Sequence, residues 1–252
     1  MGEHLVRVEE ERGVVRALME RGANALDLPL MEALKQVVIV AREKGVPLLL
    51  SSTNPRVFCP GWNLKQLAYA GREEVARFLS QFTDLVLTLF SYPGPTLAAI
   101  GGHAIAGGCS LALACDHRVM ASGRPRIGMA EVNLGVPVPA QCVQMLRARL
   151  APNVVDELVF ARDGLNAERA AAMGIVQRVA PPERLDAVVE QELSALAARP
   201  AHAYAETKRF SYQHVWERMA QVQEEAAAAF VDCWFAPDTQ ARVQGMAARL
   251  SR

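Results

Sequence analysis

Apolar and polar positions in the first part of the chain alternate between the period of a strand and the period of a helix. Residues 5–8 and 14–18 are short apolar runs on either side of a glycine turn, which predicts two paired strands. A helix is expected to begin at Asp27, because Asp is a favoured N-cap and Pro29 is tolerated in a first turn. Gly45 ends this helix, and its apolar stripe consists of Leu30, Leu34, Val37, Val38 and Ala41.

The same order of strand, strand and helix recurs towards residue 100. Residues 47–51 and 95–100 are continuous apolar runs and predict buried strands, whereas residues 73–90 repeat with the period of a long amphipathic helix. This order predicts the α/β fold class.

After Pro139 the pattern becomes mostly helical. Helices are expected at residues 140–150, 154–161, 167–173 and 182–198 and from residue 201 onward, with one late strand at 176–179. Arg199 and Pro200 predict a junction, so we divide the chain into a core, residues 1–199, and a C-terminal helical region, residues 200–252. That region carries more aromatic surface than a free-standing segment would expose. We therefore predict that it is buried against the core or a neighbouring subunit. Its large aromatic residues include Trp216, Phe230, Trp234 and Phe235.

Candidate chemistry begins at a glycine turn in residues 105–116, Ile-Ala-Gly-Gly-Cys-Ser-Leu-Ala-Leu-Ala-Cys-Asp. Small residues here end a strand-like run and open an apolar helix, whose first N–H groups have no partner within the helix. The turn at Gly107 and Gly108 is therefore a candidate oxyanion hole. The alternative is that the two glycines only let a helix pack closely on a sheet.

A second turn of this kind lies upstream, in residues 56–64. Pro60 and Gly61 bend the chain after an apolar run, and Asn63 is expected to cap the segment that follows. Two such turns would offer two convergent N–H donors.

The pair of turns, with Ala98-Ala99-Ile100 before the second and Glu131 after it, resembles the crotonase superfamily of enoyl-CoA hydratases and isomerases. The resemblance runs from Asn24-Ala25-Leu26 to Gly174-Ile175-Val176, and more loosely to Phe235, Asp238 and Gly245-Met246. It implies a crotonase-like spiral of repeated ββα units with a C-terminal helical region that serves in trimerisation or as a lid. It also implies an acyl-CoA or enoyl-CoA thioester as substrate and a homotrimer or hexamer.

The resemblance also implies roles for individual residues. The backbone N–H groups of Trp62 and Gly107 would bind the thioester carbonyl, and Glu131 would be the catalytic acid and base. Trp62 stands where many relatives have Ala, so its indole would narrow the acyl site, stack beside it, or pack in the core or a subunit contact. Candidates for binding CoA are Ala25, Leu26, Phe58 and Pro60, and candidates for the substrate pocket are Ser110, His103 and Pro139.

Ser110 discriminates between branches of the family, because it occupies the first of two positions that hold glutamates in the hydratases. The second position is Glu131. The segment around Glu131 is similar to the delta3,delta2-enoyl-CoA isomerases, and residues 106–110 and 115–118 are similar to them as well. One carboxylate suffices to move a proton from C2 to C4, whereas a serine does not accept a proton from water at neutral pH. Pro139 aligns with an aspartate of the dehalogenase-like and dienoyl-CoA isomerase branches and supplies no acid.

These features predict a delta3,delta2-enoyl-CoA isomerase. The alternatives are an enoyl-CoA hydratase, another crotonase-type lyase or hydrolase, and a non-catalytic family member that binds acyl-CoA. Apolar neighbours of Glu131 are expected to raise its pKa from about 4.3 towards neutrality, where a general base works best. The alternative for Glu131 is a solvated loop carboxylate.

Two further side chains near the second turn have competing interpretations. A thiol at a helix N-terminus, such as Cys109, can act as a nucleophile, but no partner histidine is identifiable by spacing and a small Cys in such a helix is usually core. His103 lies at a strand end, where a structural role is favoured over one in the acyl site.

Composition narrows the class of protein. The 252 residues are 51% hydrophobic, which is enough for a sizeable core, and 27 Lys and Arg balance 27 Asp and Glu. No basic run points to nucleic acid, although Arg21, Arg56 and Lys65 lie near the segments expected to meet CoA.

Cysteine usage and the termini complete these expectations. The five cysteines lack Cys-x-x-Cys spacing, so neither a disulfide framework nor a metal site is expected. No cofactor is expected apart from CoA as part of the substrate. We also expect no membrane segment, no targeting peptide and a cytoplasmic location.

Overall fold

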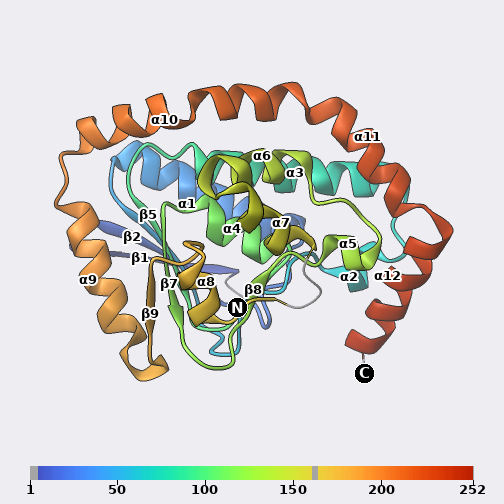
Figure 1. Ribbon diagram of the computed structural model, residues 1–252, viewed down its shortest axis with the longest axis horizontal. Coiled ribbons are helices and arrows are strands. Elements are labelled where there is room, and N and C mark those ends of the chain that lie inside the picture. The colour runs from blue at the N-terminus through green and yellow to red at the C-terminus, as the bar shows by residue number, and fades with distance from the viewer. Residues whose placement is uncertain (1–4, 161–163, 252) are drawn as a thin grey trace.

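The computed structural model describes residues 5–160 and 164–251, and its first half repeats the order strand, strand, helix four times (Figure 1). This repetition confirms the predicted spiral of ββα units. The four repeats are β1 (Val6–Glu11), β2 (Val14–Met19) and α1 (Leu28–Lys44); β3 (Leu48–Ser52), β4 (Val57–Cys59), α2 (Leu64–Leu67) and α3 (Arg72–Phe90); β5 (Thr96–Ile100), β6 (His103–Ile105) and α4 (Gly107–Ala114); β7 (His117–Ala121), β8 (Ile127–Gly128) and α5 (Glu131–Leu134).

The strands form two sheets. The larger has the order β1-β2-β3-β5-β7-β9 and is parallel except for the β1–β2 pair, whereas the smaller, β4-β6-β8, is entirely parallel. Each repeat after the first therefore gives its first strand to the large sheet and its second strand to the small one. Because β4, β6 and β8 are parallel, the turns that follow them lie at one edge, where ligands of such sheets bind.

Helices cover both faces of the large sheet and explain its apolar runs. The apolar faces of α1 and α3 and the whole of α4 are buried in the main core, while α9 packs against β5 and β7 on the other side. The start of α1 is as predicted, because the carboxylate of Asp27 accepts a hydrogen bond from the Leu30 N–H at 3.0 Å. Gly45 ends this helix with a φ of 67°.

The second half of the described chain is helical apart from β9. Its elements are α6 (Ala140–Arg149), α7 (Pro152–Phe160), α8 (Ala167–Ala172), β9 (Arg178–Ala180), the 3₁₀ turn η1 (Pro182–Arg184), α9 (Leu185–Ala197), α10 (Ala201–Gln221), α11 (Gln223–Trp234) and α12 (Pro237–Leu250). These match the predicted helices, although position 161 of the helix expected at 154–161 lies outside the described residues. The late strand begins two residues later than predicted and ends one residue later.

Some local features differ from the predictions. The strand predicted at 95–100 is present as β5, but the chain then crosses at once to the small sheet as β6. A Cβ on Gly102 would lie 2.2 Å from the backbone of Arg56, so only glycine permits this crossing. The strands β7 and β8 were not predicted. Asn63 precedes α2 but makes no side-chain capping bond. Glu131 begins a short helix, α5, and does not lie in a loop.

The C-terminal helices pack on the core of the same chain. In Figure 1, α10 passes over α6, and α11 and α12 descend beside α5 and α2 at the end of the molecule opposite α9. The carboxylate of Asp116 fixes α10, because it accepts bonds from Lys208 Nζ at 2.8 Å and from the Tyr204 hydroxyl at 3.0 Å. Among residues 5–160 and 164–251, no helix is both long enough and apolar enough to cross a membrane.

Candidate active site

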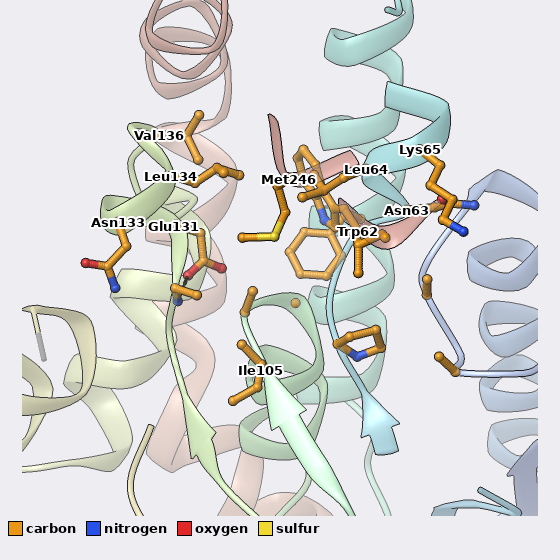
Figure 2. Close-up of a pocket in the computed structure, with 18 of the residues that line it drawn as sticks. Trp62, Asn63, Leu64, Lys65, Ile105, Glu131, Asn133, Leu134, Val136 and Met246 are labelled. Atoms are coloured by element: carbon orange, nitrogen blue, oxygen red, sulfur yellow. Dashed lines mark hydrogen bonds between the residues drawn. The ribbon is translucent and has the colours of Figure 1, made fainter. Parts of the chain in front are cut away.

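A cavity of about 890 Å³ opens at the edge of the small sheet where β4, β6 and β8 end. Three successive turns supply its centre, with Trp62 after β4, Gly107 after β6 and Glu131 after β8. Figure 2 shows Trp62 and Glu131 on opposite sides of this space, with Met246 between them. The spiral therefore brings together three positions that are spread between Trp62 and Glu131 in the chain.

The turn after β4 is held by the backbone of Leu26. The Leu26 N–H donates to the Gly61 carbonyl and the Asn63 N–H donates to the Leu26 carbonyl, both at 2.8 Å. These bonds make a parallel bridge between Leu26 and Trp62. The Trp62 N–H therefore points away from Leu26, and in the described part of the chain it has no acceptor.

The turn after β6 is strained. Ala106 has a φ of 52° and a ψ of −121°, a conformation that side-chain-bearing residues rarely adopt and that tends to occur at functional sites. It is held there by a bond from the Ala106 N–H to the Gly128 carbonyl at 2.9 Å. Gly107 follows as the first residue of α4, so its N–H is one of the donors that a helix leaves free.

Glycines let the two turns touch. A Cβ on Gly61 would lie 3.2 Å from the backbone nitrogen of Gly107, and a Cβ on Gly108 would lie 2.0 Å from the carbonyl oxygen of Cys59. Gly61 also has a φ of 93°, which favours glycine. The N–H groups of Trp62 and Gly107 are thus carried by two backbone segments in direct contact, as a two-donor oxyanion hole requires.

Glu131 faces the cavity from the start of α5. Its side chain is half-buried, and its Oε2 accepts a bond from the Ala130 N–H at 2.8 Å. Burial raises the pKa of Glu131 to about 6, and the N–H groups of Glu131 and Ala130 partly oppose that rise. Among the described residues that line the cavity, Glu131 is the only carboxylate, so it is the sole candidate base of that set.

Behind the cavity lies a layer of buried small side chains. Ser110 is fully buried and does not line the cavity; its hydroxyl donates to the sulfur of Met129 at 3.9 Å. Cys109 is also fully buried, and this burial, together with the negative charge of Glu131, raises the pKa of its thiol well above the ordinary value. A thiol held protonated in this way is a poor nucleophile, which counts against the alternative considered for Cys109.

The structure separates the other predicted residues into two groups. Pro139, Ala25 and Pro60 line the cavity. His103 lies half-buried in β6 and does not line it, and the side chains of Leu26 and Phe58 are buried in the core. Leu26 contributes through its backbone bridge to Trp62, as described above. The Phe58 carbonyl accepts a bond from Asn24 Nδ2 at 3.2 Å.

An aromatic and aliphatic wall of the cavity was missed in the sequence. Phe82 comes from α3, Phe230 and Trp234 come from α11, and Met246 and Leu250 come from α12. The sequence predicts that the aromatic residues of the C-terminal region are buried. It does not indicate which residues they contact.

Cations lie on the other side of the cavity from Glu131. Lys65 is exposed at the cavity wall, and Figure 2 shows it beyond Trp62 as seen from Glu131. Arg21 also lines the cavity and pairs with Asp27, whereas Arg56 is exposed outside the cavity. Within the described ranges, no group of three or more His, Cys, Asp or Glu side chains is arranged to hold a metal ion.

Comparisons with known proteins agree with this architecture. The family model for enoyl-CoA hydratase/isomerase matches residues 9–248. The mitochondrial methylglutaconyl-CoA hydratase of Mus musculus is 34% identical over 175 residues, which cover 68% of this chain and 55% of the relative. This chain thus spans about half the length of that relative. A crotonyl-CoA hydratase of Syntrophomonas wolfei is 26% identical over 250 residues, 98% of this chain and 95% of the relative.

The fold has a near match among solved structures. Human mitochondrial delta3-delta2-enoyl-CoA isomerase superimposes with a TM-score of 0.93 over 98% of both chains, at 24% sequence identity. That identity establishes a shared fold and no more. The family match over residues 9–248 shows that the chain belongs to the enoyl-CoA hydratase/isomerase family, the crotonase superfamily.

Proposed function

We propose that this protein is a delta3,delta2-enoyl-CoA isomerase in which Glu131 is the acid and base and the N–H groups of Trp62 and Gly107 bind the thioester oxygen. The observation that carries the proposal is the single carboxylate of the cavity lining, which faces two backbone donors without a protein acceptor. This count refers to the described residues. An isomerase needs one group that takes and returns a proton, and the lining offers one.

In the proposed reaction the thioester oxygen accepts hydrogen bonds from Trp62 and Gly107. Glu131 removes a proton from C2, the C2–H electron pair moves into a C1–C2 double bond, and the carbonyl electrons move onto oxygen to give a dienolate. The carboxylic acid of Glu131 then gives the proton to C4, where the C3–C4 π pair forms the new C–H bond. The C1–C2 π pair moves to C2–C3, and the electron pair on oxygen restores the carbonyl. Protons and electrons balance without a metal or redox cofactor, and CoA takes part only as a component of the substrate.

The environment of each group supports this division of work. The two N–H groups are fixed in place by the Leu26 bridge and by the strained Ala106, so they need no rearrangement when charge develops on the oxygen. Burial brings the pKa of Glu131 to about 6, so the carboxylate is ionised at neutral pH. This pKa is also close enough to neutral pH for the protonated form to return the proton.

Hydration of a 2-enoyl-CoA is the second candidate, because two of the relatives named above are hydratases. Hydration needs a group that deprotonates water while C2 is protonated. Ser110 stands at the corresponding position and is buried away from the cavity. Its hydroxyl donates a hydrogen bond to the sulfur of Met129. This arrangement favours isomerisation over hydration, and the presence of Glu131 disfavours a family member that only binds acyl-CoA.

The remaining assignments are also proposals. We place the CoA moiety beside Ala25 and Pro60, where Lys65 adds a positive charge for its phosphates. A homotrimer or hexamer stays a prediction of the resemblance. The cytoplasmic location stays a prediction as well, and some relatives are mitochondrial.

The proposal is tested by Glu131→Gln, which keeps the shape of the side chain and removes its basic oxygen. The variant should bind an acyl-CoA about as well as the wild type and lose exchange of the C2 proton with deuterated water, measured by NMR. Glu43→Gln, at an exposed position of α1, is the matched control and should exchange normally. Substantial exchange by Glu131→Gln would remove Glu131 from the mechanism.

A further inference from the structure

We infer that the indole of Trp62 closes the acyl end of the cavity, so that the enzyme selects short, uncharged acyl chains and Trp62 sets the upper limit of chain length. This inference rests on the proposed function for the position of the thioester. It assigns a specificity-determining role to the Trp62 side chain, separate from the role of its backbone N–H.

The Trp62 side chain fills the space between α3 and α11. Its ring centroid lies 5.0 Å from that of Phe78 and 5.6 Å from that of Phe82, both on α3. On the α11 side it lies 5.3 Å from Phe230 and 6.0 Å from Trp234. Such centroid distances and tilted ring planes are typical of stacked or edge-to-face aromatic contacts, so the indole is held from both helices.

This position separates the cavity from the core behind it. Trp62, Phe82, Phe230 and Trp234 line the cavity, whereas Phe78 is fully buried and does not. The indole therefore stands between the cavity and Phe78. A smaller side chain at position 62 would open the cavity further between α3 and α11, while the backbone N–H would remain.

The charge of the lining indicates what kind of acyl chain fits. Apart from Glu131, the charged residues of the described lining are Arg21, which pairs with Asp27, and Lys65, on the far side of Trp62 from Glu131 in Figure 2. A carboxylate at the end of an acyl chain would thus meet the aromatic wall without a cation. Burying such a charge without a partner is strongly unfavourable.

Binding of saturated acyl-CoAs of increasing length tests the inference without catalysis. With the wild type, affinity should rise about fourfold for each added methylene, the value expected from the transfer of a CH₂ group, and then stop rising at a defined length. In Trp62→Ala and Trp62→Leu the rise should continue to longer chains. A length limit that is the same in both folded variants as in the wild type would overturn the inference.

Two controls complete the design. Trp216→Leu removes another half-buried tryptophan, which packs on Phe90 outside the cavity, and should leave the length limit unchanged. If Trp62→Ala does not fold by circular dichroism, Trp62→Leu and Trp62→Phe carry the test, with Phe expected to shift the limit least. A shift in Trp216→Leu equal to that in Trp62→Leu would also contradict the inference.

The charge preference has its own readout. Glutaryl-CoA should bind the wild type at least tenfold more weakly than valeryl-CoA, and equal binding would show that the acyl end accepts a carboxylate. Repeating the length series in Glu131→Gln separates the two proposals. If Glu131→Gln keeps both the length limit and the exchange of the C2 proton, the catalytic role of Glu131 is wrong and the role of Trp62 is unaffected.

Discussion

Gly61 lies so close to Ala106 that a methyl group on Gly61 would come within 2.9 Å of the Ala106 Cβ. These residues belong to the two turns whose N–H groups face the cavity, one after β4 and one after β6. The distance between the donors is therefore set by the absence of a side chain at position 61. A side chain at position 61 would therefore push the two turns apart.

Gly61→Ala should accordingly reduce the isomerase rate by about 100- to 1000-fold, the loss typical of removing one oxyanion donor. Gly45→Ala is the matched control, because Gly45 also has a positive φ, 67°, but a Cβ there would meet nothing within 4 Å. Both variants bear the strain of the left-handed conformation, and only Gly61→Ala moves the donors. Equal rates for the two variants, measured by absorbance of the conjugated product, would count against the two-donor site.

The pKa of Glu131 predicts the pH dependence of catalysis. Burial raises this pKa to about 6, and the base form is the active one, so kcat/KM should be constant above that pH and fall below it. The fall should approach tenfold per pH unit. An initial-rate profile between pH 4.5 and 8 that is flat through 6 would contradict the assigned base.

The same shift predicts an effect on stability. Because the pKa of Glu131 is higher in the folded protein than its ordinary value of 4.5, the folded state is destabilised as the pH rises from about 4.5 to about 6. Glu131→Gln removes this penalty and should unfold with a free energy about 2 kcal/mol higher than the wild type at pH 8, at 1.36 kcal/mol per pKa unit. Urea titrations should show little difference at pH 4.5. A variant less stable than the wild type at pH 8 would refute the desolvated carboxylate.

A buried ion pair connects the C-terminal helices to the core. Burial raises the pKa of Asp116, but Lys208 and Arg149 together hold it below its ordinary value. Lys208→Met would remove one partner of this buried carboxylate and should lower the free energy of unfolding by about 3–5 kcal/mol. Arg209→Met, next to it on α10 but in an exposed pair with Glu206, should change stability by less than about 1 kcal/mol. Similar losses for the two variants would show that the pair does not hold α10.

The parts of the site that lie close together in sequence were predictable. Gly107 with Gly108 and Pro60 with Gly61 are turn signals in the sequence, and Glu131 stands out as a carboxylate in an apolar segment. The repeated apolar runs likewise predicted the ββα order, because buried parallel strands are continuous apolar stretches. These signals depend on residues that are neighbours in the sequence, so sequence patterns can indicate them.

The parts that depend on distant contacts were not predictable. The strand β8 has only two residues, and β7 begins with the polar residues His117 and Arg118, so neither is a continuous apolar run that periodicity would indicate. Periodicity also does not say that Phe230 and Met246 reach a cavity whose other walls come from residues 21–139. The burial of Ser110 likewise depends on Met129, which packs against it from another repeat.

The most direct test of the proposed activity compares two reactions of the wild-type protein under identical conditions. With a 3-enoyl-CoA the protein should form the conjugated 2-enoyl thioester, and with crotonyl-CoA it should add water at least 100-fold more slowly, because Glu131 is the only carboxylate among the described residues that line the cavity. Both rates are measured by absorbance of the conjugated thioester, with products confirmed by mass spectrometry. Brisk hydration of crotonyl-CoA with no shift of the 3-enoyl double bond would contradict the isomerase assignment.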